Sequence, residues 1–201
     1  MADPFPKYDV LDKHDTPSWN EMTRRVIDER LSLKEDEGTL VREQLETLRR
    51  LVARVAPQPE RRPPATTVAI VLQKIASNSG DGFRPAGFPQ VREAWLCGLD
   101  ALEAEARECH AACFADLDDD CADILLRRVA SGNVRSEAWA HLSSSQFWKS
   151  RVLPDILSAH WAHPSLWSAM GFGGPAGPRG YVRLDANRRD GWEAQEEEER
   201  A

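Results

Sequence analysis

The distribution of apolar residues along the chain predicts a protein built from amphipathic helices. Steps of three and four residues place side chains on one face of a helix. One stripe with this spacing runs through the segment 89–114 and comprises Val91, Trp95, Leu99, Leu102, Ala106, Cys109 and Cys113. A second runs through 39–56 and comprises Val41, Leu45, Leu48, Val52 and Val55. Both segments are expected to be helices with one buried face.

Residues typical of helix ends delimit further helices. Ser18 and Glu21 have the spacing of a capping box and follow a proline, so a helix is expected to start there. An aspartate cap near Asp118 and a terminating glycine at Gly132 predict another helix between them. The apolar, β-branched run of 66–77 fits a strand or a helix. We favour a helix because the neighbouring segments are helical.

The rest of the chain predicts more helix separated by loops. A helical stretch is expected to begin at Trp139, and another to cover 143–163 with a kink at Pro154. His163 precedes a proline and should end that run. Connectors, loops or turns are expected at 57–64, 77–89 and 165–170. No segment alternates like a strand, so we predict an all-α fold, a single helical bundle.

Four consecutive parts are expected along the chain. They are an extended N-terminal segment with the first helix (1–35), a helical domain (36–170), a strap rich in glycine and proline (171–192) and an acidic tail (193–201). The strap begins GFGGPAGPRGYVRLD. A phosphate-binding loop needs a preceding strand and a following helix. The strap has neither pattern, and its prolines remove backbone N–H groups, so we interpret it as a recognition element or an ordered cover of the bundle.

Composition narrows the range of partners. A formal net charge of −7 and a pI of about 5.3 disfavour binding to nucleic acid, whose phosphates would repel the chain. No apolar stretch approaches the roughly 18 residues that would insert into a bilayer. The N-terminus has prolines and acids where a secretion signal has a basic start and an apolar core, so we expect a cytoplasmic protein. Seven tryptophans suit both a core and a protein interface.

Cysteine and histidine are the residues that could carry chemistry. The four cysteines are separated by eleven, three and seven residues, unlike the paired spacing of zinc frameworks. Cys109 and Cys113 share an apolar helix stripe, which favours core packing. The alternative is a stand-alone metal or thiol redox protein that uses Cys109, His110, Cys113 and Cys121, or His160 and His163. No nucleophile motif accompanies them.

Four blocks of sequence together resemble the gluconate 2-dehydrogenase subunit 3 family. In order they are LETLRRLVARVAPQ, AWLCGLDALEAEA, FADLDDDCADILL and HPSLWSAMGFGGPAGPRGYVRL. The resemblance covers roughly residues 40–192. The fourth block, which contains the start of the strap, is the most specific.

The resemblance implies a small, non-catalytic helical subunit without a cofactor of its own. Its partner would be a large FAD-dependent oxidoreductase of the glucose–methanol–choline type that acts on sugars, polyols or glycosides. The small subunit would bind this partner and stabilise or mature it, and a cytochrome subunit is a further candidate member. Many family members carry a twin-arginine export signal, which is missing here. The pair is therefore expected in the cytoplasm, or in the periplasm if the partner carries the signal.

Residue type and the strap motif together select the predicted partner contacts. These are Trp19, Trp167, Phe172, Pro175, Pro178, Arg179, Tyr181 and Arg183. Aromatic and arginine side chains are enriched in interfaces, and proline-fixed backbone loses little entropy on docking. The N-terminal segment 1–35 is expected to wrap the same partner. A regulatory bundle that binds an unrelated protein is a third interpretation.

Overall fold

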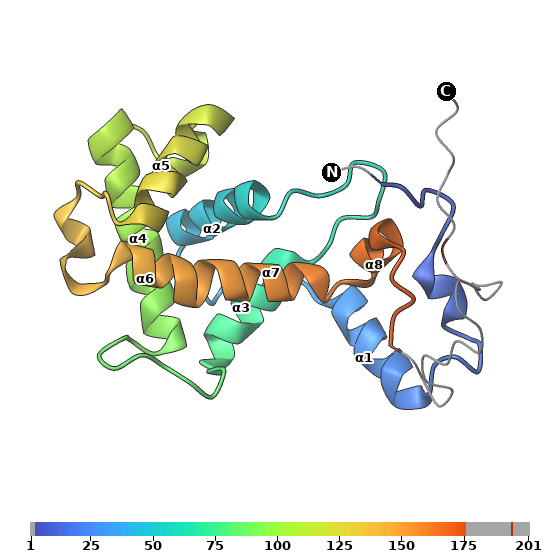
Figure 1. The fold of residues 1–201 in the computed structure, drawn as a ribbon. Helices are drawn as coiled ribbons and strands as arrows, with labels where there is room; N and C mark the ends of the chain where they lie inside the picture. Colours follow the sequence, from blue (N-terminus) through green and yellow to red (C-terminus); the bar gives the residue numbers. More distant parts are fainter. Residues whose placement is uncertain (1–2, 176–193, 195–201) are drawn as a thin grey trace, which may run out of the picture. The chain divides into compact units, whose positions relative to one another are not determined.

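The structure is a computed structural model that describes residues 3–175 and residue 194 (Figure 1). Within these residues it contains helices and no strand, which confirms the all-α prediction. The chain divides into two compact units. Unit 1 comprises the described residues of 1–33, 58–66 and 160–201, and unit 2 comprises 34–57 and 67–159. This division differs from the consecutive parts expected from the sequence, because three separate stretches build unit 1.

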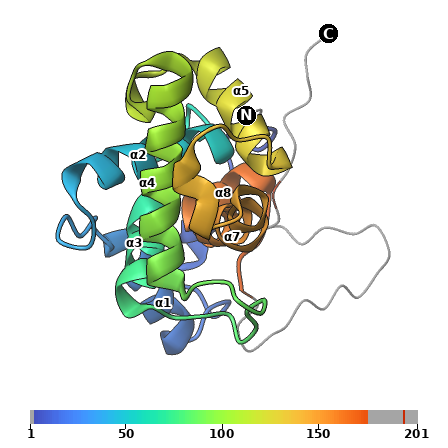
Figure 2. The same cartoon turned by 90° about the vertical axis from the view of Figure 1, so that its left-hand side faces the viewer.

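Unit 2 is organised around one long helix. The α-helices that lie wholly in it are α2 (Arg42–Val55), α3 (Thr67–Ser77), α4 (Val91–His110), α5 (Asp119–Ser131) and α6 (Ser144–Phe147), and residues 153–159 of α7 (Leu153–Trp161) also belong to it. The central helix α4 packs against the other four, and Figure 2 shows it running between them. The predicted stripes are buried where they face this core: Leu48, Trp95 and Leu99 are each fully buried. Helix α3 confirms that the ambiguous β-branched run is helical.

In unit 2 the predicted start and end of α5 are correct, whereas the predicted end of α4 is wrong. Asp118 caps α5 by accepting a hydrogen bond from the Cys121 N–H, and Gly132 ends the helix with a left-handed φ of +83°, both as expected. Helix α4 ends at His110, not near residue 114, because Ala111 adopts a left-handed φ of +53°. Cys113, the last residue of the predicted stripe, therefore lies outside the helix.

The segment around Pro154 is irregular. A short 3-10 helix, η3 (Glu137–His141), precedes α6, and a π-helical stretch, η4 (Trp148–Val152), separates α6 from α7 (Leu153–Trp161). Proline has no N–H to donate and crowds the preceding turn, so a wider turn just before it is a physical alternative to a sharp kink.

Unit 1 contains η1 (Val10–Lys13), α1 (Glu21–Ser32) and α8 (Pro164–Met170). Helix α1 starts later than expected, because Asn20 and not Ser18 caps it, with Asn20 Oδ1 accepting from the Thr23 N–H at 2.8 Å. The segment expected to be a turn at 165–170 is helix α8, which has a proline in its first turn and His163 as its cap. The connector 58–66 packs into this unit.

Candidate partner-binding site

Two predicted contact residues, Trp19 and Trp167, form the small core of unit 1. They pack with Val10 and Ile27, and their exposed fractions are 1% and 5%. The Trp167 Nε1–H donates to the carbonyl of Trp161 at 2.6 Å. Both indoles thus pack within the chain, and any contribution that they make to partner binding acts through the surface that they support.

The start of the strap lies against this core through glycines. Gly171 has a φ of +68° and Gly174 a φ of +73°, a region that L side chains rarely adopt. A Cβ on Gly171 would lie 2.6 Å from Cε2 of Phe5, and one on Gly174 would lie 3.0 Å from Cζ2 of Trp19. A side chain at either position would therefore require the aromatic ring or the backbone to shift, in addition to the strained left-handed φ.

Between the two glycines the strap presents Phe172 to solvent. Its ring meets the Trp167 ring edge-on, with centroids 5.7 Å apart and an interplanar angle of 89°, and 42% of the residue is exposed. Pro175 is also exposed. Because one edge of Phe172 is already packed, the ring is held in position while its outer face stays accessible.

The N-terminal segment is docked on α8 and on the strap by polar contacts. The Val10 N–H donates to Ser168 Oγ at 3.0 Å, and Ser168 Oγ lies 3.2 Å from Asp9 Oδ1. Lys13 Nζ donates to the carbonyl of Gly173 at 3.2 Å. These bonds join residues about 160 positions apart and place the segment and the described start of the strap, residues 171–175, in one structural unit.

An arginine of the connector, Arg62, holds the other end of that segment. Arg62 donates to both carboxylate oxygens of Asp3, at 2.7 and 3.1 Å, and to the carbonyls of Phe5 and Tyr8, at 2.5 and 2.7 Å. The Arg62 and Asp3 side chains are only 9% and 8% exposed. Burial raises the pKa of Asp3, but the hydrogen bonds from Arg62 and the Phe5 N–H outweigh it, so the pKa lies below its usual value.

His160 and His163, considered above as metal ligands, are both buried in unit 1. His163 caps α8: its Nδ1 accepts from the Ser165 N–H at 3.3 Å and lies 2.7 Å from Ser165 Oγ. Burial and the nearby charges of His160 and Arg30 lower the pKa of His163 to about 4. A neutral ring that accepts at Nδ1 suits a structural cap.

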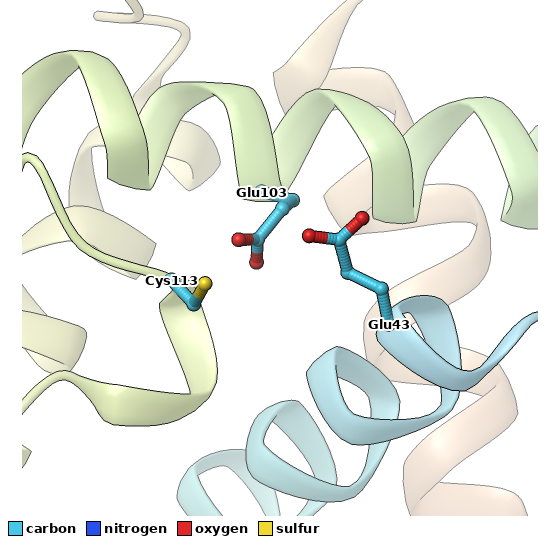
Figure 3. Close-up of side chains that lie close together, drawn as sticks. All are labelled: Glu43, Glu103 and Cys113. Carbon is cyan, nitrogen blue, oxygen red and sulfur yellow. The ribbon is translucent and has the colours of Figure 1, made fainter.

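Unit 2 brings together one group with metal-ligand chemistry among the described residues. Glu43 of α2, Glu103 of α4 and Cys113 converge so that one ligand atom of each lies within 4.8 Å of the others (Figure 3). Arg107 forms ion pairs with Glu43 and Glu103, the latter at 3.2 Å. The Glu103 carboxylate also accepts from Thr47 Oγ1 at 3.2 Å. The guanidinium thus already compensates both carboxylates, as in a structural ion-pair cluster.

The other residues considered above as metal ligands in this part of the chain do not join this group. Within the described residues, Cys109, His110 and Cys121 form no set of three with Cys113 at metal-binding distance. The hydrogen bond with Glu103 raises the pKa of Cys113, and that with Asp118 raises the pKa of Cys121. Both thiols are therefore held in the protonated form, whereas reactive cysteines have a depressed pKa.

The predicted partner contacts fall into three groups. Trp19 and Trp167 are buried, Phe172 and Pro175 are exposed, and Pro178, Arg179, Tyr181 and Arg183 lie outside the described residues. Sequence reasoning missed Arg62 and Ser168, which hold the N-terminal segment. The pair of arginines between prolines in PQPERRPP was a signal for Arg62, because a stiff connector can position a side chain accurately.

Two further findings concern membrane spans and known proteins. No helix in the described part of the chain has the length and apolar character needed to cross a bilayer. No curated protein and no solved structure matches the chain. The family model described as gluconate 2-dehydrogenase subunit 3 matches residues 42–174, which include every helix of unit 2 as well as α8 and the start of the strap. The chain therefore belongs to the gluconate 2-dehydrogenase subunit 3 family.

Proposed function

We propose that this chain is an accessory subunit that binds a large FAD-dependent oxidoreductase of the glucose–methanol–choline type and stabilises or matures it. The observation that carries the proposal is the family match over residues 42–174. In this proposal the flavin and the oxidation of a sugar, polyol or glycoside belong to the partner. This chain contributes a binding surface.

The strap is the proposed contact surface. Its first residues follow a left-handed backbone path that glycine adopts readily at Gly171 and Gly174. This path leaves Phe172 and Pro175 exposed next to the core of unit 1. A side chain that is ordered before binding loses less entropy on docking. The predicted contacts Pro178, Arg179, Tyr181 and Arg183 would extend this surface. Trp19 and Trp167 would act indirectly, by holding the base of the strap.

The decisive experiment is co-expression of the chain with the large subunit, followed by affinity purification through a tag on this chain. We expect a yellow, FAD-containing complex and less flavin-loaded large subunit when this chain is omitted. A variant with Phe172→Ala, Arg179→Ala and Tyr181→Ala should recover much less complex. Ile124→Ala is the control, because Ile124 is 52% exposed on α5 and lies outside both the strap and the N-terminal segment. Undiminished recovery with the triple variant would contradict the assigned surface.

A further inference from the structure

The loop between α3 and α4, residues 78–90, exposes a large aromatic side chain. Phe83 is 79% exposed, more than any other large apolar residue in the described part of the chain. In both ribbon views the loop extends past the ends of α3 and α4 (Figures 1 and 2). Phe88, in the same loop, is 3% exposed and belongs to the unit 2 core. One phenylalanine thus secures the loop while the other faces solvent.

Ion pairs to the interior of unit 2 hold the first half of the loop. The Asp81 carboxylate accepts from Lys74 Nζ at 2.5 Å and from Arg151 at 3.2 Å. Both cations also pair with Asp155, whose side chain is completely buried and accepts from the Trp95 Nε1–H at 2.8 Å. The hydrogen bond from Lys74 lowers the pKa of Asp81, so the carboxylate stays charged at neutral pH. The position next to Phe83 is therefore tied to buried groups.

Hydrogen bonds also hold the second half of the loop. A guanidinium N–H of Arg84 donates to the carbonyl of Phe88 at 2.7 Å, and the Phe88 N–H donates to the carbonyl of Pro85 at 3.1 Å. Gly82 and Gly87 supply left-handed backbone, with φ of +83° and +74°. The backbone on both sides of Phe83 is thus fixed, although the Phe83 side chain gains little burial from it.

A phenylalanine on a fixed backbone has the properties of an interface anchor. Burial of such a side chain against a partner is favourable, and folding of this chain leaves that free energy unused. Residues that dominate binding are typically large side chains that enter a partner pocket, and a preordered backbone reduces the entropy lost on binding. Phe83 also lies inside the family-matched range, unlike the N-terminal segment.

The charges around the loop indicate the chemistry of the pocket. Asp81 and Asp155 are compensated by Lys74 and Arg151, so these four charges cancel. Arg84 adds a positive charge directly beside Phe83, on a chain whose net charge is −7. A partner surface that complements this site has an apolar pocket with carboxylates at its rim.

We propose that Phe83, with Arg84 beside it, anchors this chain to the large oxidoreductase subunit by filling an apolar pocket that has carboxylates at its rim. This inference rests on the proposed function and adds a second contact site, in unit 2, to the strap in unit 1. It predicts that the Phe83 side chain contributes to affinity and not to the stability of the free chain, because this side chain is mostly in water.

The test measures the dissociation constant of the full-length chain with the purified large subunit. Phe83→Ala should raise the dissociation constant about 30-fold or more, the effect of a dominant interface residue. The melting temperature of the free variant should equal that of the wild type. Ile124→Ala is the matched control: Ile124 is 52% exposed on α5, and its loss should change the dissociation constant less than about threefold. Arg84→Gln should weaken binding and reduce its dependence on salt.

Three results would overturn the inference, and they are distinguishable. Wild-type affinity for Phe83→Ala, in a system where the wild-type complex forms, removes the loop from the interface and leaves the proposed function intact. A wild-type chain that forms no complex with the large subunit overturns the proposed function and this inference together. Self-association of the free chain that Phe83→Ala abolishes, with unchanged binding to the large subunit, assigns the loop to a second copy of this chain.

Discussion

Replacing Arg62 with alanine should release the N-terminal segment of unit 1 and leave unit 2 folded. Arg62 makes four hydrogen bonds to Asp3, Phe5 and Tyr8 from a nearly buried position. The other bonds that fasten the segment, from Val10 and Lys13, involve α8 and the strap and would remain. We therefore expect local opening of residues 3–8, the part of the segment that precedes these remaining bonds.

The contacts set the size of the effect. Removing one partner of a buried ion pair costs about 3–5 kcal/mol, because the other charge is left without compensation. Here the segment can move into water instead, which limits the cost to the free energy of its docking. We take the lower end of that range, about 3 kcal/mol, as the loss in the free energy of opening. Since each 1.4 kcal/mol is a factor of ten, opening becomes roughly 100-fold more frequent.

Hydrogen–deuterium exchange measured by mass spectrometry would check this prediction. Peptides covering residues 3–8 should exchange roughly 100-fold faster in Arg62→Ala, whereas peptides from α4 should be unchanged. Arg61→Ala is the matched control, because Arg61 is the exposed neighbour of Arg62 on the same connector. Equal protection of residues 3–8 in Arg62→Ala and in the wild type would refute the reasoning that this arginine holds the start of the segment.

Two further predictions concern unit 1. The pKa of His163 is lowered to about 4 from the ordinary 6.5, so as the pH falls the unfolded chain binds the proton before the folded chain does. The neutral His163 therefore contributes roughly 3 kcal/mol to the free energy of unfolding above pH 6.5, and this contribution is lost as the pH falls to about 4. Thermal denaturation between pH 7 and pH 4 should show this loss of stability. His163→Asn keeps a capping side chain but does not titrate, so the stability of this variant should depend less on pH. An equally steep pH dependence in the variant would contradict the role of His163. Gly171→Ala should lower the free energy of unfolding by about 1–3 kcal/mol, because Gly171 has a left-handed φ and a Cβ there would meet Phe5. Gly80→Ala is the control: a Cβ at Gly80 meets open space, so the free energy of unfolding should change by less than about 0.5 kcal/mol. Urea denaturation followed by tryptophan fluorescence compares the two, and equal stability would show that the strap can shift away from Phe5.

Local sequence patterns determined most of the helices. The stripe Leu45, Leu48 and Val52 predicted α2, and the cap at Asp118 with the glycine at Gly132 delimited α5. These features act over three or four residues, and the hydrogen bonds involved form within the helix itself. The family could also be recognised from the sequence, because its motif lies in consecutive residues.

The tertiary structure decided what these helices do together. Trp19 and Trp167 are distant in sequence, and only the fold shows that they share a core instead of facing a partner. The same holds for Arg62, which binds Asp3 59 residues away. Phe83 and Phe88 have equal hydrophobicity, yet one is exposed and the other buried. Burial and long-range pairing depend on how separate segments meet in space, and no pattern of neighbouring residues encodes that meeting.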